Sequence, residues 1–68
     1  MGMKDFQITL KAARVNAGYT IVEASKLAGI GKDTLIKWEK HPEVISVKNA
    51  SLLAKLYRCP LNVIYFGE

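Results

Sequence analysis

The chain contains 68 residues, of which 50% are hydrophobic and 24% are charged, and its formal net charge is +4 at pH 7. A chain this short buries only about 60% of the surface that it exposes when unfolded, so residues 1–68 are expected to form one domain with one core. This excludes a two-domain enzyme with a cofactor cleft, and the hydrophobic share excludes a disordered chain. The charge hints at a polyanionic partner but decides nothing, because many ordinary domains carry such a charge.

Cysteine usage and hydropathy predict a cytoplasmic protein without a membrane partner. The single cysteine, Cys59, cannot form an internal disulfide, whereas small secreted domains usually carry several. No apolar run approaches the roughly 18 residues of a membrane span, and no apolar segment of a signal peptide follows Met1. Met1-Gly2 ahead of Met3 is typical of a cloning remnant.

The first predicted element is a helix over about residues 5–17. Apolar side chains recur there at spacings of four, three and four, which is one face of a helix: Phe6, Leu10, Ala13 and Ala17. Asp5 is the expected N-cap and Gly18 the expected stop signal.

Two short helices follow, over residues 20–28 and 32–39. Thr20 with Glu23 three residues later forms a capping-box pattern, and the apolar residues expected to face inward are Ala24, Leu27 and Ala28. The segment 29–31, Gly-Ile-Gly, separates the two helices, and in the second one Leu35 and Trp38 share a face.

Two more helices are predicted in the C-terminal third. Ser46 is a good N-cap for a fourth helix, whose inward residues are expected to be Val47, Ala50, Leu53, Ala54 and Tyr57. Pro60 suits the first turn of a fifth helix over residues 60–66. Five short helices without any strand pattern predict a small all-α domain.

Two short helices joined by a tight, glycine-containing turn are typical of the helix-turn-helix. The segment 19–39 resembles the Cro and repressor type helix-turn-helix of phages and bacteria, the Xre or lambda-repressor-like family. The residues that carry the likeness are Thr20, Glu23-Ala24, Lys26-Leu27-Ala28-Gly29-Ile30, Thr34 and Trp38-Glu39. The likeness extends to most of the chain through Leu10, Arg14 and Gly18, Leu53 to Tyr57, Cys59 to Asn62 and Ile64 to Phe66.

The resemblance implies a compact five-helix domain with the helix-turn-helix at about residues 20–39. It implies a sequence-specific regulator of transcription, a phage or bacterial repressor or Cro-like protein, that binds double-stranded DNA with the helix at 32–39 in the major groove. Arg14 and Glu39 match the residues of a partly buried salt bridge that holds this helix in place. Two unrelated solvated charges are the alternative interpretation.

Lys32, Asp33, Ile36 and Lys37 match the family's base-facing positions or lie beside them. Lysine donates to guanine O6 and N7, an acidic side chain accepts from cytosine N4, and an apolar side chain contacts the thymine methyl. An ordinary solvated helix face is the competing interpretation of this group.

The phosphate contacts expected from the resemblance and from helix-terminus chemistry involve Thr20, Thr34, Lys40 and His41. Because the chain has one histidine and one cysteine, neither has partners for a metal site. No metal and no cofactor are expected, and Cys59 is interpreted as a small core residue.

The chain departs from the family pattern at three places. Ile21 stands where glutamine is usual and Val22 where glutamate is usual, which suggests contact with DNA methyl groups, a protein partner or tighter packing. Pro42 to Ile45 replace a basic loop. The expected recognition unit, residues 19–45, is formally neutral, with Lys26, Lys32, Lys37 and Lys40 against Glu23, Asp33, Glu39 and Glu43. Weak non-specific binding is therefore predicted, because each neutralised phosphate adds affinity.

A homodimer, at least on DNA, is expected to form through the domain itself. The candidate surface consists of Val44, Ile45, Val63, Tyr65 and Phe66. The alternative is that Ile64, Tyr65 and Phe66 only close the core.

A second functional hypothesis is a protein-interaction module on the same scaffold, such as an antitoxin or anti-repressor. An enzyme with a small-molecule substrate is not expected, because the chain lacks clustered carboxylates and a glycine-rich phosphate loop.

Overall fold

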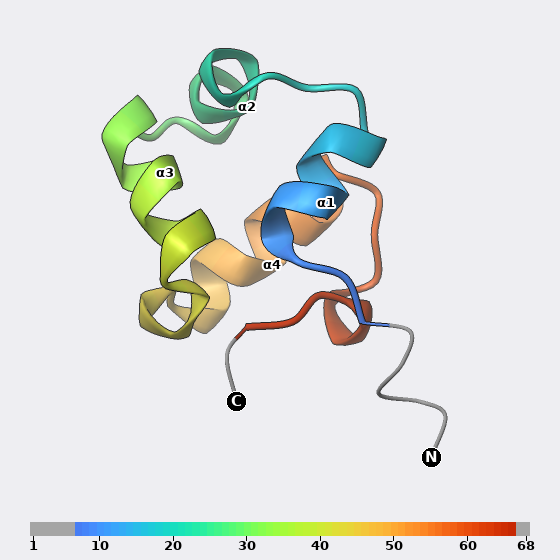
Figure 1. Cartoon of the computed structure of the whole chain (residues 1–68). Coiled ribbons are helices and arrows are strands. Elements are labelled where there is room, and N and C mark those ends of the chain that lie inside the picture. Colours follow the sequence, from blue (N-terminus) through green and yellow to red (C-terminus); the bar gives the residue numbers. More distant parts are fainter. Residues whose placement is uncertain (1–6, 67–68) are drawn as a thin grey trace.

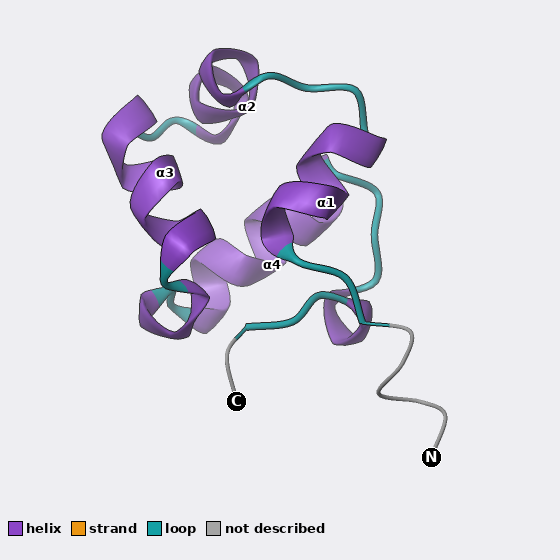
Figure 2. Cartoon of the chain, viewed as in Figure 1, coloured by secondary structure: helices purple, strands orange, loops and turns teal. Residues whose placement is uncertain are grey.

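Short helices and single 3-10 turns make up the part of the chain that the structure, a computed structural model, describes, namely residues 7–66 (Figure 1). The α-helices of this part are α1 (Leu10–Asn16), α2 (Ile21–Ala28), α3 (Lys32–Lys40) and α4 (Val47–Leu56), and its 3-10 turns are η2 (Pro42–Val44) and η3 (Leu61–Val63). Loops connect these helices and no strand occurs between residues 7 and 66 (Figure 2). The predicted all-α class is confirmed for these residues, whereas the predicted count of five helices is wrong.

Helix α1 begins later than predicted, at Leu10. Thr9 is its N-cap, and its hydroxyl accepts a hydrogen bond from the Ala12 N–H at 3.0 Å. Ile8, just before the cap, is extended and pairs with the C-terminal segment, so it cannot belong to a helix. Asp5 and Phe6, like Met1 and Gly2, lie outside the described residues.

The fifth helix predicted over residues 60–66 is wrong, because only the turn η3 forms there. Ile64 is extended and forms an isolated parallel bridge with Ile8. The Ile8 N–H donates to the Val63 carbonyl at 2.9 Å, and the Tyr65 N–H donates to the Ile8 carbonyl at 2.8 Å. The same long-range pairing therefore shortens α1 and prevents a last helix.

The three middle helices form where their caps predict them. Thr20 and Glu23 make both hydrogen bonds of the capping box, and α2 ends at Gly29 in the left-handed conformation. Gly31 is the N-cap of α3. The Ser46 hydroxyl accepts from the Asn49 N–H at 3.2 Å at the start of α4.

Every α-helix contributes to one hydrophobic core. Its buried members are Leu10, Ala13, Ala24, Leu35, Leu53, Ala54, Tyr57 and Ile64. Cys59 is half-buried and packs against this core. Two residues predicted to face inward are instead exposed: Leu27 by 58% and Val47 by 77%. Helix α2 packs through Ala24 and Ser25 with the partly buried Ile21 and Ala28, and Leu27 lies to the side of this face. Val47 is the first residue of α4, ahead of the buried Ala50.

Two backbone sites with positive φ allow a matched test of the helix ends. Gly29 has φ of 72°, and a Cβ placed there meets no atom within 4 Å, so Gly29→Ala is expected to cost only the backbone strain, about 1 kcal/mol. Arg58, which follows α4, has φ of 54°, and Arg58→Gly is expected to leave stability unchanged or raise it by up to about 1 kcal/mol. Urea unfolding of both variants measures these opposite effects. Equal destabilisation by the two substitutions would contradict them.

Candidate nucleic-acid interface

A tight turn at residues 29–31 connects α2 and α3. Gly29 adopts a left-handed conformation that a residue with a Cβ rarely takes, and its N–H donates to the Lys26 carbonyl at 3.1 Å. The Ile30 N–H donates to the Ser25 carbonyl at 3.0 Å. These bonds satisfy the last carbonyls of α2 and fix the direction in which the chain leaves it. Helix α3 therefore starts at a defined angle to α2 (Figure 1).

The inner faces of α2 and α3 are fully packed. Ala24 on α2 and Leu35 on α3 both have 0% of their surface exposed. The small side chain of Ala24 lets α3 come close, because the distance between packed helices depends on the side chains at the contact. Ser25 is also buried, and its hydroxyl donates to the Val22 carbonyl at 3.0 Å. Trp38 is half-buried against the same core, as its helical spacing from Leu35 predicted.

The outer face of α3 carries hydrogen-bonding side chains that are free to meet a ligand. Lys32, Asp33, Thr34 and Lys37 are all exposed, whereas Ile36 is half-buried. The N-cap Gly31 supplies no side-chain hydrogen bond to the first turn of α3. This face presents donors from lysine, an acceptor from aspartate and a hydroxyl, which is the kind of set that base edges require.

A buried ion pair connects α1 to the C-terminal half of α3. Arg14 Nε lies 2.7 Å from Glu39 Oε2 and Arg14 Nη2 lies 3.3 Å from Glu39 Oε1, and each side chain is only 9% exposed. The remaining nitrogen, Nη1, donates to the Tyr19 carbonyl at 2.9 Å. The planar guanidinium thus holds α1, the loop before α2 and α3 together, which a lysine ammonium cannot do in this fork geometry.

Comparison with known proteins places this arrangement in a family. The helix-turn-helix family model HTH_3 matches residues 10–64, which is most of the chain and includes α2, the turn and α3. The chain belongs to the Cro/C1-type helix-turn-helix family. No curated protein and no solved structure matches it. The family is one of DNA-binding transcription regulators, so the chain carries a DNA-binding domain of that type. Helix α3 is the second helix of its helix-turn-helix.

The start of α2 in this helix-turn-helix domain is closed by reciprocal hydrogen bonds. The Thr20 hydroxyl accepts from the Glu23 N–H at 3.1 Å, and the Glu23 carboxylate accepts from the Thr20 N–H at 2.9 Å. Because a hydroxyl also has a hydrogen to donate, Thr20 can still bind an anion. Ile21 packs against the core, which accounts for its departure from the family's glutamine, whereas Val22 remains 49% exposed.

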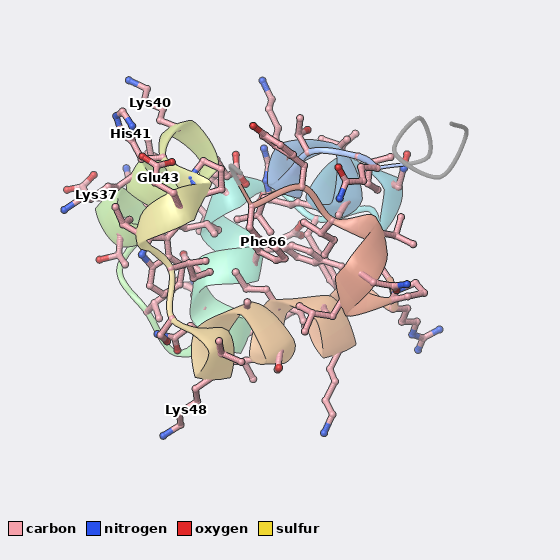
Figure 3. All side chains as sticks on the ribbon, turned by 90° about the horizontal axis from the view of Figure 1, so that it is seen from below. Lys37, Lys40, His41, Glu43, Lys48 and Phe66 are labelled. Atoms are coloured by element: carbon pink, nitrogen blue, oxygen red, sulfur yellow. The ribbon has the colours of Figure 1, made fainter. Side chains whose placement is uncertain are left out.

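Polar side chains continue beyond the end of α3. Lys40 and His41 are exposed, and Glu43 follows in η2. His41 Nδ1 lies 3.7 Å from Glu43 Oε2, and both side chains are mostly exposed. Figure 3 shows these three side chains with Lys37 at the same corner of the domain, while Lys48 points to another corner.

An apolar groove lies beside η2 and the start of α4. Its volume is about 190 Å³, and it is lined by Pro42, Glu43, Ile45, Val47, Ala50, Leu61 and Phe66. Of the residues predicted for a dimer surface, Ile45 and Phe66 therefore lie in one groove. Val44 and Tyr65 are exposed by 52% and 43%, and Val63 is half-buried. Phe66 also packs against the core, so it contributes both to the wall of the groove and to the core.

Tyr57, the C-cap of α4, is a buried polar residue near the ion pair. Its hydroxyl has no hydrogen-bond partner among the described residues, and its ring lies 6.3 Å from that of Tyr19. The pKa of Tyr57 is raised from 10.0 to about 12, mainly by burial and also by the nearby Glu39 carboxylate, while the Arg14 guanidinium acts in the opposite direction. The sequence placed Tyr57 inside the core, but no spacing rule indicated that it, or the Tyr19 carbonyl, would lie beside Arg14.

The described part of the chain offers neither a metal-binding cluster nor a membrane-spanning helix. Residues 7–66 contain no group of three or more His, Cys, Asp or Glu side chains arranged to hold a metal ion. No helix in this range has the length and apolar character needed to cross a membrane.

Removing one partner of the buried ion pair is expected to be far more damaging than removing both. Arg14→Met leaves the Glu39 carboxylate buried without its partner, a change that costs about 3–5 kcal/mol in other proteins. That is a large part of the stability of any small domain, so we expect this variant to be largely unfolded at 25 °C. The double variant Arg14→Met with Glu39→Leu is expected to recover most of the loss. Circular dichroism and urea unfolding measure both, and a double variant no more stable than the single one would refute the interpretation.

Tyr57 is expected to make the stability of the domain fall in alkali. The folded protein keeps this proton to a higher pH than the unfolded chain, so the stabilisation is complete below about pH 10 and is lost as the pH rises to about 12. Tyr57→Phe has no such proton, so its stability relative to the parent should increase between pH about 9 and about 11.5. Urea midpoints at the two values measure the change. Tyr65→Phe, at an exposed tyrosine, is the matched control, and an equal increase in it would contradict the assignment.

Proposed function

We propose that this protein is a sequence-specific regulator of transcription of the repressor or Cro-like kind, which reads double-stranded DNA with α3 in the major groove. The observation that supports this most is the two-sided character of α3. Leu35 and the Arg14–Glu39 pair hold its inner face, while exposed polar side chains cover the outer one. A helix held rigidly on one side and polar on the other suits direct readout of base edges.

The base contacts that we propose follow from the chemistry of each side chain. Lys32 and Lys37 donate to guanine O6 and N7, and Asp33 accepts from cytosine N4. Ile36 contacts a thymine methyl with the part of its side chain that remains exposed. Residues 33 and 37 lie one turn apart on the same side of α3, which lets both reach neighbouring base pairs.

The phosphate contacts that we propose flank α3 on the surface. Thr20 at the start of α2 and Thr34 in the first turn of α3 donate through their hydroxyls. At the end of α3, Lys40 contributes a positive charge and His41 contributes an exposed imidazole. Such contacts position the protein on the duplex but carry no sequence information themselves.

A second copy of the chain is the proposed partner at the apolar groove. Val44 and Tyr65 are exposed, and Ile45 and Phe66 line the groove, so a copy related by two-fold symmetry would cover apolar surface on both subunits. Val63 completes the proposed surface as a half-buried neighbour. Such a dimer places two α3 helices on half-sites about one helical turn apart.

A protein-interaction module is the second candidate function, and the outer side of α2 favours it. Val22 and Leu27 are exposed by 49% and 58%. A hollow of about 280 Å³ is lined by Tyr19, Glu23, Lys26 and Leu27. Exposed apolar side chains beside a hollow suit a protein partner better than they suit a phosphate.

Selection of bound sequences from random duplex DNA tests the proposed function. The unmodified protein should enrich a two-fold symmetric site, and Lys37→Ala should bind that site about 5- to 150-fold more weakly and relax the preference at one position. The matched control is Lys55→Ala, because Lys55 is exposed in the last turn of α4, which leads away from α3 (Figure 1). Unchanged affinity and preference in Lys37→Ala would refute the base contact.

A salt titration separates the two candidate functions. Several phosphate contacts predict a steep loss of affinity for random DNA with rising salt, whereas a protein-interaction module predicts a slope near zero. A slope near zero for the unmodified protein would therefore refute DNA binding as the function.

A further inference from the structure

At the end of α3 the surface carries one acidic side chain beside three basic ones. Lys37 and Lys40 lie in the last turns of α3, and His41 follows them. Glu43 is the acidic residue of this corner, and Figure 3 shows its side chain on the same side as these three. Lys48, in the first turn of α4, points away to another corner, so it does not compensate the carboxylate.

The chain itself positions Glu43 against His41. The His41 N–H donates to the Lys37 carbonyl at 2.8 Å, and the Val44 N–H donates to the His41 carbonyl at 3.1 Å. Pro42 begins the turn between these bonds and restricts its backbone. The result is the separation of 3.7 Å between His41 Nδ1 and Glu43 Oε2. These backbone bonds place the two residues at the same corner, where their side chains, both mostly exposed, face each other.

This pair has a direct effect on a phosphate that approaches the corner. A protonated imidazole attracts phosphate, and a neighbouring carboxylate cancels that attraction. Sequence-independent binding depends on the number of phosphates that cations neutralise. Glu43 therefore lowers by about one the number of positive charges that this corner offers to DNA phosphates. It does not change the side chains that we propose to read bases.

We propose that Glu43 limits the sequence-independent part of DNA binding by neutralising His41. This inference rests on the proposed function. A cell offers a very large number of competing non-specific sites, so weak backbone affinity leaves more of a regulator free to reach its own site. The Glu43–His41 pair weakens affinity for the DNA backbone at the end of α3, where Lys37 and Lys40 also lie.

The test compares Glu43→Gln with the parent on random-sequence duplex DNA. Measurements run from about 50 to 200 mM salt at about pH 6, on the acid side of the range in which imidazoles titrate. The variant should bind random DNA more tightly, with a salt slope steeper by about 0.9, so that its advantage shrinks about threefold across this range. The preferred bases within each half-site should stay the same, because no base contact changes.

Two further variants show whether Glu43 acts through His41. In a His41→Gln background the gain from Glu43→Gln should be much smaller, because the cation that Glu43 neutralises is already absent. Asn16→Lys is the control for net charge, since it also adds one positive charge, at the exposed last residue of α1, which belongs neither to the groove nor to the residues that we propose to contact DNA. Its random-DNA slope should match the parent's. Thermal unfolding checks that all variants remain folded.

Three results would overturn the inference: an unchanged slope in Glu43→Gln, an equal gain in the His41→Gln background, or changed base preferences within the half-sites. Failure of the proposed function gives a different result, because the unmodified protein would then show no salt-dependent DNA binding at all, and the inference would fail with it.

Discussion

The position of α3 depends on one guanidinium. Arg14 makes two contacts to Glu39 and a third to the Tyr19 carbonyl, so one side chain joins α1, the loop before α2 and the end of α3. Because the pair is nearly buried, water does not compete for these bonds, and a lost partner leaves an uncompensated charge in a poorly solvated place. A helix whose side chains must meet base edges has to be held within a narrow range of orientations. The ion pair and the packed Leu35 together impose that constraint at both halves of α3.

The two sides of α3 are therefore under different physical demands. On the inner side, Ala24 is small enough for α3 to approach closely, and Leu35 fills the contact. On the outer side Lys32, Asp33 and Lys37 are exposed, so their charged groups are accessible to a ligand. The same division continues past the helix end, where the polar His41 and Glu43 lie outward while Ile45 turns toward the groove. Affinity for the DNA backbone and choice of bases can then be adjusted at separate residues.

The sequence predicted the middle of the fold better than its ends. Thr20, Gly29 and Ser46 specify where α2 and α4 start and where α2 stops, because their signals are hydrogen bonds made within a few residues. The end helices were mispredicted because Ile8 and Ile64 pair across 56 positions of sequence, and a local pattern cannot show a long-range bridge. Of the candidate site, exposure of Lys32, Asp33 and Lys37 followed from helical spacing, whereas the half-burial of Ile36 depended on neighbouring elements.

The sequence by itself determined the class of the protein, the helix-turn-helix at its centre and the residue types on the outer face of α3. These properties follow from helix periodicity, from caps and from a family pattern that covers most of the chain. Only the tertiary structure decided that Tyr57 lies beside the ion pair and that Leu27 and Val47 face solvent. The reason is that each of these depends on how the turns orient the helices against one another, and the angle between two packed helices is set by the side chains of both.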